Sequence, residues 1–93
     1  MIRRATTKGE IINRMCLYLS ELGDPARSSS VQGVVARSYA KSTVLELIEE
    51  VIHSDTDPAL VVSEFIKKVN KRDGFIFSVA YDIAVDLYDR VFL

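Results

Sequence analysis

The sequence predicts an all-α fold, a small bundle of four helices with short connections, or five if one long segment is broken. Two observations carry this prediction. Apolar residues recur at intervals of three and four along most of the chain, which is the spacing of one face of a helix. Residues typical of helix starts and ends separate these stretches. With 93 residues, 48% of them hydrophobic, the chain has the size of one small domain, so we expect a single helical domain over residues 1–93.

The first expected helix begins near Lys8, because Thr7 and Glu10 have the spacing of a capping box. Gly23 suits the position just after the helix, and Pro25 prevents its continuation. The apolar face of this helix consists of Ile11, Ile12, Met15, Tyr18, Leu19 and Leu22.

Residues 31–53 favour helix, but their apolar face changes direction along the segment. The two apolar clusters are Val31, Val34, Val35 and Tyr39, and then Val44, Leu45, Ile48, Val51 and Ile52. Any of Ser28, Ser29 and Ser30 suits the N-cap, and Thr43 with Glu46 forms a second possible capping box. The pattern fits either a bent helix or two helices meeting near residues 41–43, and we favour the break.

The third expected helix starts at Asp57-Pro58, with Asp as N-cap and Pro in the first helical position. Its basic C-terminal turn suits the negative end of the helix dipole, and Gly74 can take the left-handed conformation that ends a helix. The apolar face consists of Val61, Val62, Phe65, Ile66 and Val69.

The last helix, over residues 75–92, has the widest apolar surface of the chain. Its polar stripe is narrow and consists of Ser78, Asp82, Asp86 and Asp89. Apolar residues, interrupted by Arg90, cover about two thirds of the circumference, far more than a surface helix needs. We therefore expect this helix to be the central element against which the others pack.

Part of this wide apolar surface is expected to stay uncovered in a single chain and to form an interface. The expected interface residues are Phe77, Ala80, Tyr81, Ala84, Tyr88 and Val91. A homodimer is the simplest way to cover them, and another protein partner would serve as well. Alternatively, the segment before Thr7 and the loop after Gly23 cover this surface within one chain.

The net charge of −1 hides an uneven distribution. Residues 1–41 carry seven basic and three acidic side chains, whereas residues 42–93 carry five basic and ten acidic ones. Either the two halves fold against each other, or the basic N-terminal portion binds an acidic partner such as a nucleic acid.

Residues 34–44 (VVARSYAKSTV) resemble helix-turn-helix proteins in a small residue ahead of a turn and a Ser-Thr-Val at the start of a second helix. The resemblance covers about a dozen residues and implies DNA recognition by the second helix. However, the turn lacks a glycine, and Glu46, Glu49 and Glu50 on the second helix would repel a polyanion.

No pattern in the chain points to catalysis, a cofactor or a metal site. His53, Asp55 and Asp57 are too few ligands for a calcium loop, and helix ends explain His53 and Asp57. Cys16, the only cysteine, has no neighbouring base, so we expect a packed, unreactive thiol.

The location and the general function follow from what the chain contains and lacks. A single cysteine fits a reducing compartment, and no stretch of about 18 apolar residues could span a membrane, so we expect a cytoplasmic protein. The sequence favours a non-enzymatic protein–protein interaction or regulatory module that self-associates. The alternative is a nucleic-acid-binding, helix-turn-helix-like regulator that uses the basic N-terminal portion.

Overall fold

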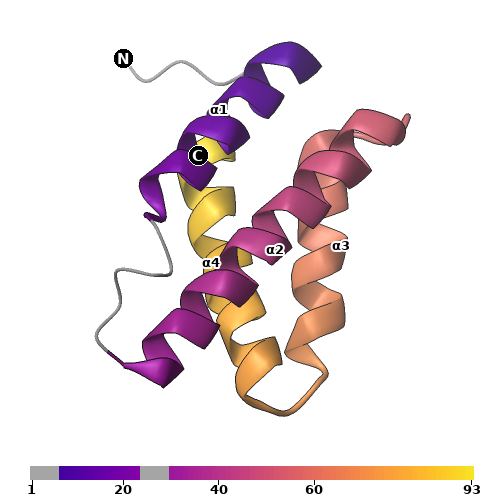
Figure 1. Cartoon of the computed structure of the whole chain (residues 1–93). Helices are drawn as coiled ribbons and strands as arrows, with labels where there is room; N and C mark the ends of the chain where they lie inside the picture. Colours follow the sequence, from indigo (N-terminus) through magenta and orange to yellow (C-terminus); the bar gives the residue numbers. More distant parts are fainter. Residues whose placement is uncertain (1–6, 24–29) are drawn as a thin grey trace.

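The computed structural model describes residues 7–23 and 30–93, and within them the chain forms four α-helices and no strand. The helices are α1 (Lys8–Glu21), α2 (Val31–His53), α3 (Pro58–Asn70) and α4 (Phe75–Phe92). Figure 1 shows α2, α3 and α4 running in alternating directions, joined by short connections. The predicted all-α bundle of four helices is therefore confirmed.

The ends of α1 and the start of α2 follow the expected capping chemistry. The Thr7 hydroxyl oxygen accepts a hydrogen bond from the Glu10 amide at 3.1 Å. Gly23, just after α1, has a φ of +77°, which side chains with a Cβ rarely adopt. Of the three candidate serines, Ser30 caps α2 and accepts the Gly33 amide hydrogen bond at 3.0 Å. These short-range signals thus set the two ends of α1 and the start of α2 as predicted.

The start of α3 is also as predicted, but its end differs. Asp57 accepts the Ala59 amide hydrogen bond at 3.1 Å, and Pro58 opens the helix. Gly74 was expected to end α3, yet α3 ends at Asn70 and Gly74 is the N-cap of α4, with a φ of +122°. The sequence correctly predicted that position 74 needs a glycine. It assigned Gly74 to the end of α3, whereas the structure places it at the start of α4.

The preferred break in residues 31–53 is wrong, because α2 runs without interruption from Val31 to His53. Thr43 does not cap a new helix. Its hydroxyl donates a hydrogen bond to the carbonyl oxygen of Tyr39 at 2.8 Å, one turn earlier in the same helix. The absence of a turn within residues 34–44 also removes the feature on which the helix-turn-helix resemblance depends.

The change of apolar face along α2 has a different cause from a break. The second half of the helix faces the core, whereas the first half extends past its neighbours and exposes apolar side chains. Val31 is 82% exposed, and Val35 and Tyr39 are also on the surface. The buried residues of α2 are Ala40, Thr43, Val44, Leu47, Ile48 and Val51.

The core lies where all four helices meet. Its most deeply buried members are Met15 of α1, Leu47 of α2, Val62 of α3 and Leu87 of α4. As predicted, α4 packs against each of the other three helices. α2 also contacts all three, while α1 and α3 lie on opposite sides of the α2–α4 pair (Figure 1).

Candidate functional site

A groove opens between α2 and α3 along the outer edge of α3. One section, of about 650 Å³, lies between the C-terminal half of α2 and the N-terminal half of α3. A second section, of about 460 Å³, continues towards the N-terminus of α4. Phe65 and Lys68 line both sections, so the two are parts of one groove. We call this surface, which follows α3 from Leu60 to Arg72, the α2–α3 groove.

The groove stays open because of the side chains that α2 places on this side. α3 packs mainly along α4, and its contact with α2 is slight. The α2 residues that line the groove include Glu46, Glu50 and His53. Closing the helices over two carboxylates without partners would cost several kcal/mol, so the polar wall keeps the helices apart.

The lining is mainly apolar, and several of its side chains are open to solvent. Leu60 is 48% exposed and Ile76 is 43% exposed, while Phe65 and Phe77 are half-buried. The guanidinium of Arg72 lies 5.4 Å from the centroid of the Phe77 ring, a cation–π contact at one rim of the groove. Concave apolar surfaces with a charged rim are typical of binding sites.

Charges are ordered along the groove. Glu64 lies in the middle of α3, and a basic ridge follows towards and just beyond its C-terminal end. The ridge consists of Lys67, Lys68, Lys71 and Arg72, which with Glu64 border a shallow hollow on the outside of α3. The facing wall, from α2, contributes Glu46 and Glu50. The groove is thus acidic along one wall and graded from acidic to basic along the other.

Three of the six predicted interface residues are covered by the chain itself. Ala84 has no exposed surface, Val91 is 1% exposed and Ala80 is 6% exposed. Ala84 and Val91 belong to the core cluster, which contains residues from all four helices. The chain's own helices therefore cover these three residues, and they offer almost no surface to a second molecule. The segment before Thr7 and the loop after Gly23, the alternative cover, lie outside the described residues.

The other three predicted interface residues, Phe77, Tyr81 and Tyr88, are half-buried. Phe77 lines the α2–α3 groove, and with Tyr81 it also borders a hollow on the far side of the α3–α4 connection. The Tyr88 ring packs on Phe92 with 5.2 Å between centroids. Of the predicted set, Phe77 therefore has the clearest link to the groove.

Sequence reasoning missed the groove residues of α3. Leu60 was left out of the predicted apolar face of this helix, Glu64 was placed on its polar side, and Lys68 was considered only as part of the basic C-terminal turn. The available signal was Leu60 itself, an apolar side chain outside the stripe that starts at Val61. The exposure of Leu60 depends on the distance between α2 and α3, and the apolar pattern of one helix gives no information about that distance.

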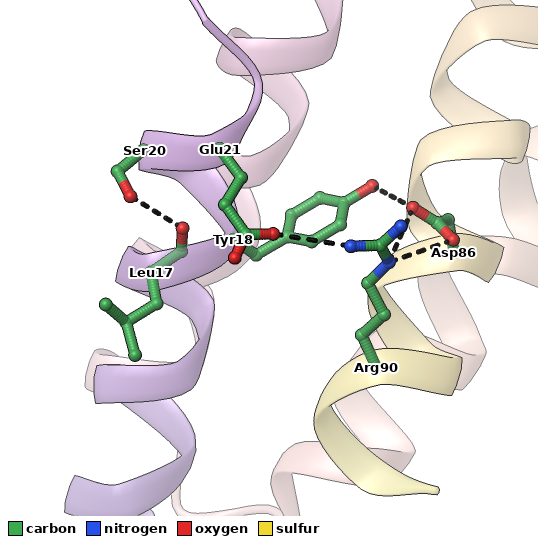
Figure 2. Close-up of polar contacts among 6 residues, drawn as sticks. All are labelled: Leu17, Tyr18, Ser20, Glu21, Asp86 and Arg90. Carbon is green, nitrogen blue, oxygen red and sulfur yellow. Dashed lines mark hydrogen bonds and ion pairs between the residues drawn. The ribbon is translucent and has the colours of Figure 1, made fainter.

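A separate polar cluster joins α1 to α4 (Figure 2). The Tyr18 hydroxyl donates a hydrogen bond to Asp86 Oδ2 at 2.8 Å. Arg90 pairs with Asp86 on its own helix and with Glu21 of α1, each at 3.3 Å. Its guanidinium lies 5.8 Å from the centroid of the Tyr18 ring. We call this cluster the Tyr18 clasp.

The Tyr18 clasp has the properties of a structural contact. Burial raises the pKa of the Tyr18 phenol, and the hydrogen bond to Asp86 raises that pKa further, because both disfavour the phenolate. A phenol with a raised pKa is a weaker acid, so Tyr18 is poorly suited to give its proton to a substrate at neutral pH. The arrangement fastens α1 to α4, and the Asp82, Asp86, Asp89 stripe contributes one member to it.

Cys16 is exposed, so the prediction of a packed thiol is wrong. Ile11, Met15 and Tyr18 form the buried face of α1. Cys16 follows Met15 by one residue, about 100° further round the helix, and this rotation carries its side chain out of the core. Cys16 is thus a surface thiol to which the structure assigns no role.

The residues that follow His53 make structural contacts at the helix ends, and the cap role predicted for Asp57 is confirmed. Asp57 caps α3, and the Ser54 hydroxyl accepts a hydrogen bond from the Thr56 amide at 3.0 Å. Over residues 7–23 and 30–93, no three His, Cys, Asp or Glu side chains are grouped as a metal site would require. The helices in those same ranges also include none that is long and apolar enough to cross a membrane.

Two cations of the basic N-terminal portion make contacts within the fold. Lys8 Nζ donates hydrogen bonds to the carbonyl oxygens of Ile52 and Ser54 at 3.0 and 2.8 Å, which ties the start of α1 to the end of α2. Arg14 donates to the Val91 carbonyl oxygen at 3.3 Å. Of the other basic residues in this portion, Arg37 and Lys41 lie on α2, and Arg3, Arg4 and Arg27 lie outside the described residues.

Comparison with known proteins finds no relative of this chain. No protein-family model matches it. No curated protein and no solved structure is significantly similar to it.

Proposed function

We propose that this chain is a small, non-enzymatic protein–protein interaction or regulatory module that self-associates as a homodimer. The observation that carries the proposal is the α2–α3 groove, where Leu60 and Ile76 lie exposed between charged walls. An apolar surface with a charged rim is the usual composition of a protein-binding surface. The single cysteine fits a reducing compartment, so we place this function in the cytoplasm.

The contacts of the N-terminal cations favour protein binding over the nucleic-acid alternative. Lys8 and Arg14 donate hydrogen bonds to main-chain carbonyl oxygens at or near the ends of neighbouring helices. These two cationic groups therefore stabilise the contacts between helices. The α2 wall of the groove carries Glu46 and Glu50, which would repel phosphate groups. These features support a protein partner at the groove.

Sedimentation equilibrium over a protein concentration series from about 1 to about 100 μM, where weak interfaces dissociate, tests the proposal. We expect the average mass to rise from that of one chain to that of two, without larger species. A single-chain mass at every concentration would contradict self-association. Retention on a heparin column that falls steeply with added salt, together with such a monomer, would instead favour nucleic-acid binding.

A further inference from the structure

We infer that the α2–α3 groove is filled by α3 of a second copy of this chain. The two α3 helices lie antiparallel about a two-fold axis level with residue 66. This inference rests on the proposed self-association and adds to it the surface and the pairing of residues. In a two-fold interface each contact occurs twice, so the outer face of α3 has to be complementary to itself when reversed.

The charge order along α3 meets this requirement. Glu64 precedes the basic ridge formed by Lys67, Lys68, Lys71 and Arg72. Reversal of a second α3 brings the basic ridge of each copy towards Glu64 of the other. The α2 wall adds to this complementarity at one end, since Glu50 lines the section with Leu60 and Glu64 and then faces the partner's basic ridge, while Glu46 lies beside Lys68 and Arg72 of its own chain.

A helix carrying charges of one sign does not fit the same groove. A basic helix would meet Lys68 and Arg72, and an acidic helix would meet Glu46, Glu50 and Glu64. The groove therefore suits a helix that carries an acidic residue ahead of basic residues and runs in the direction opposite to α3. α3 of a second copy has this order, with Glu64 ahead of Lys68 and Arg72.

An axis level with residue 66 defines the pairing. Glu64 of each copy then lies opposite the partner's Lys68, and Leu60 lies opposite the partner's Arg72. The side chain of Arg72 borders the groove section that also contains Ile76. The exposed Leu60 of one copy therefore lies near the groove section of the other copy that contains Ile76. In the dimer these two exposed apolar side chains cover each other.

A charge-reversal series measured by sedimentation equilibrium tests the pairing. Glu64→Lys opposes two ammonium groups at both symmetric positions, so we expect the dimer dissociation constant to rise by about tenfold or more. The double variant Glu64→Lys/Lys68→Glu reverses both members of each pair and is expected to restore dimerisation to about the wild-type level. The matched control is Asp82→Lys, because Asp82 is exposed on α4 and does not line the groove. This control should leave the dissociation constant unchanged.

Hydrogen exchange on the wild-type chain gives a second measurement that needs no variant. We expect slower amide exchange in residues 60–72 at high than at low protein concentration, with far smaller changes in α1. A dimer that survives Glu64→Lys, or that the double variant fails to restore, would overturn this interface and leave self-association standing. A wild-type chain that stays monomeric throughout would overturn both.

Discussion

Tyr18 illustrates how a side chain gains a second role once its neighbours are known. Its spacing on α1 marks it as a core residue, and the structure buries its ring as expected. The hydroxyl, however, reaches Asp86 on α4, sixty-eight positions further along the chain. A buried tyrosine normally needs such a partner, because an unpaired hydroxyl is costly to bury.

Replacement of Tyr18 by Phe removes this hydrogen bond and keeps the ring. We expect a loss of about 1 kcal/mol in the free energy of unfolding, because the acceptor is charged but partly solvated. Urea denaturation at neutral pH measures this change. A stability equal to that of the wild type would show that water compensates fully for the lost bond.

The raised pKa of Tyr18 also predicts a pH dependence. The unfolded chain releases the phenol proton near pH 10, whereas the folded chain retains it beyond that pH. This stabilisation is therefore complete below about pH 10 and is lost as the pH rises further. Denaturation curves recorded from neutral to alkaline pH should show a steeper loss for the wild type than for Tyr18→Phe. Parallel losses in the two proteins would contradict the assignment.

Cys16 gives a prediction opposite to the one its sequence neighbours suggest. Its side chain is exposed, so a thiol reagent should label the native protein about as fast as it labels the protein in denaturant. Mass spectrometry after short labelling times measures both rates. Slow native labelling that accelerates in denaturant would show that Cys16 is covered, for example by a second chain.

At the scale of single elements, helix ends follow local sequence closely and helix continuity does not. Ser30 and Asp57 cap their helices with the hydrogen bonds that their side chains favour. In the interior of α2, by contrast, Thr43 satisfies its hydroxyl within the helix, and packing of the second half of α2 against α4 favours one continuous element. A capping-box sequence is thus a weak predictor of a helix start where tertiary packing favours a continuous helix.

The cap at the start of α3 predicts a measurable difference between two neighbouring aspartates. Asp57→Ala removes the acceptor for the Ala59 amide and should lower the free energy of unfolding by about 1 kcal/mol. Asp55→Ala, two positions earlier and exposed, is the matched control with an expected change within about 0.5 kcal/mol. Urea denaturation midpoints compare the two variants. Equal effects would show that the cap contributes nothing specific.

At the scale of the whole molecule, α2 and α4 form the centre, and α1 and α3 lie on either side of it (Figure 1). This arrangement distributes the wide apolar surface of α4 among three neighbours. Ala80 and Ala84, expected at an interface, are therefore buried within one chain. Exposed apolar side chains of the described chain lie instead on several other surfaces, among them the α2–α3 groove and the first half of α2.

The position of the core predicts a large difference between two leucines. Leu87 has no exposed surface at the centre of α4, so Leu87→Ala should lower the free energy of unfolding by about 2–5 kcal/mol. Leu45 is 54% exposed on α2, and Leu45→Ala should cost about 1 kcal/mol or less. Thermal and urea denaturation provide the comparison. A cost for Leu45→Ala close to that for Leu87→Ala would show that Leu45 is buried in solution by another surface.

The sequence alone determined the fold class, which segments are helical and most of the helix ends, and the residues of the α1 and α3 core faces. These properties depend on side-chain periodicity and on capping groups within a few positions of one another, as at Thr7, Ser30 and Asp57. The tertiary structure alone decided the rest. Whether α2 breaks, whether Ala84 is covered and whether Leu60 is open depend on distances between helices, which residues far apart in the chain set together. The α2–α3 groove is such a property, because it arises where the acidic flank of α2 meets the apolar edge of α3.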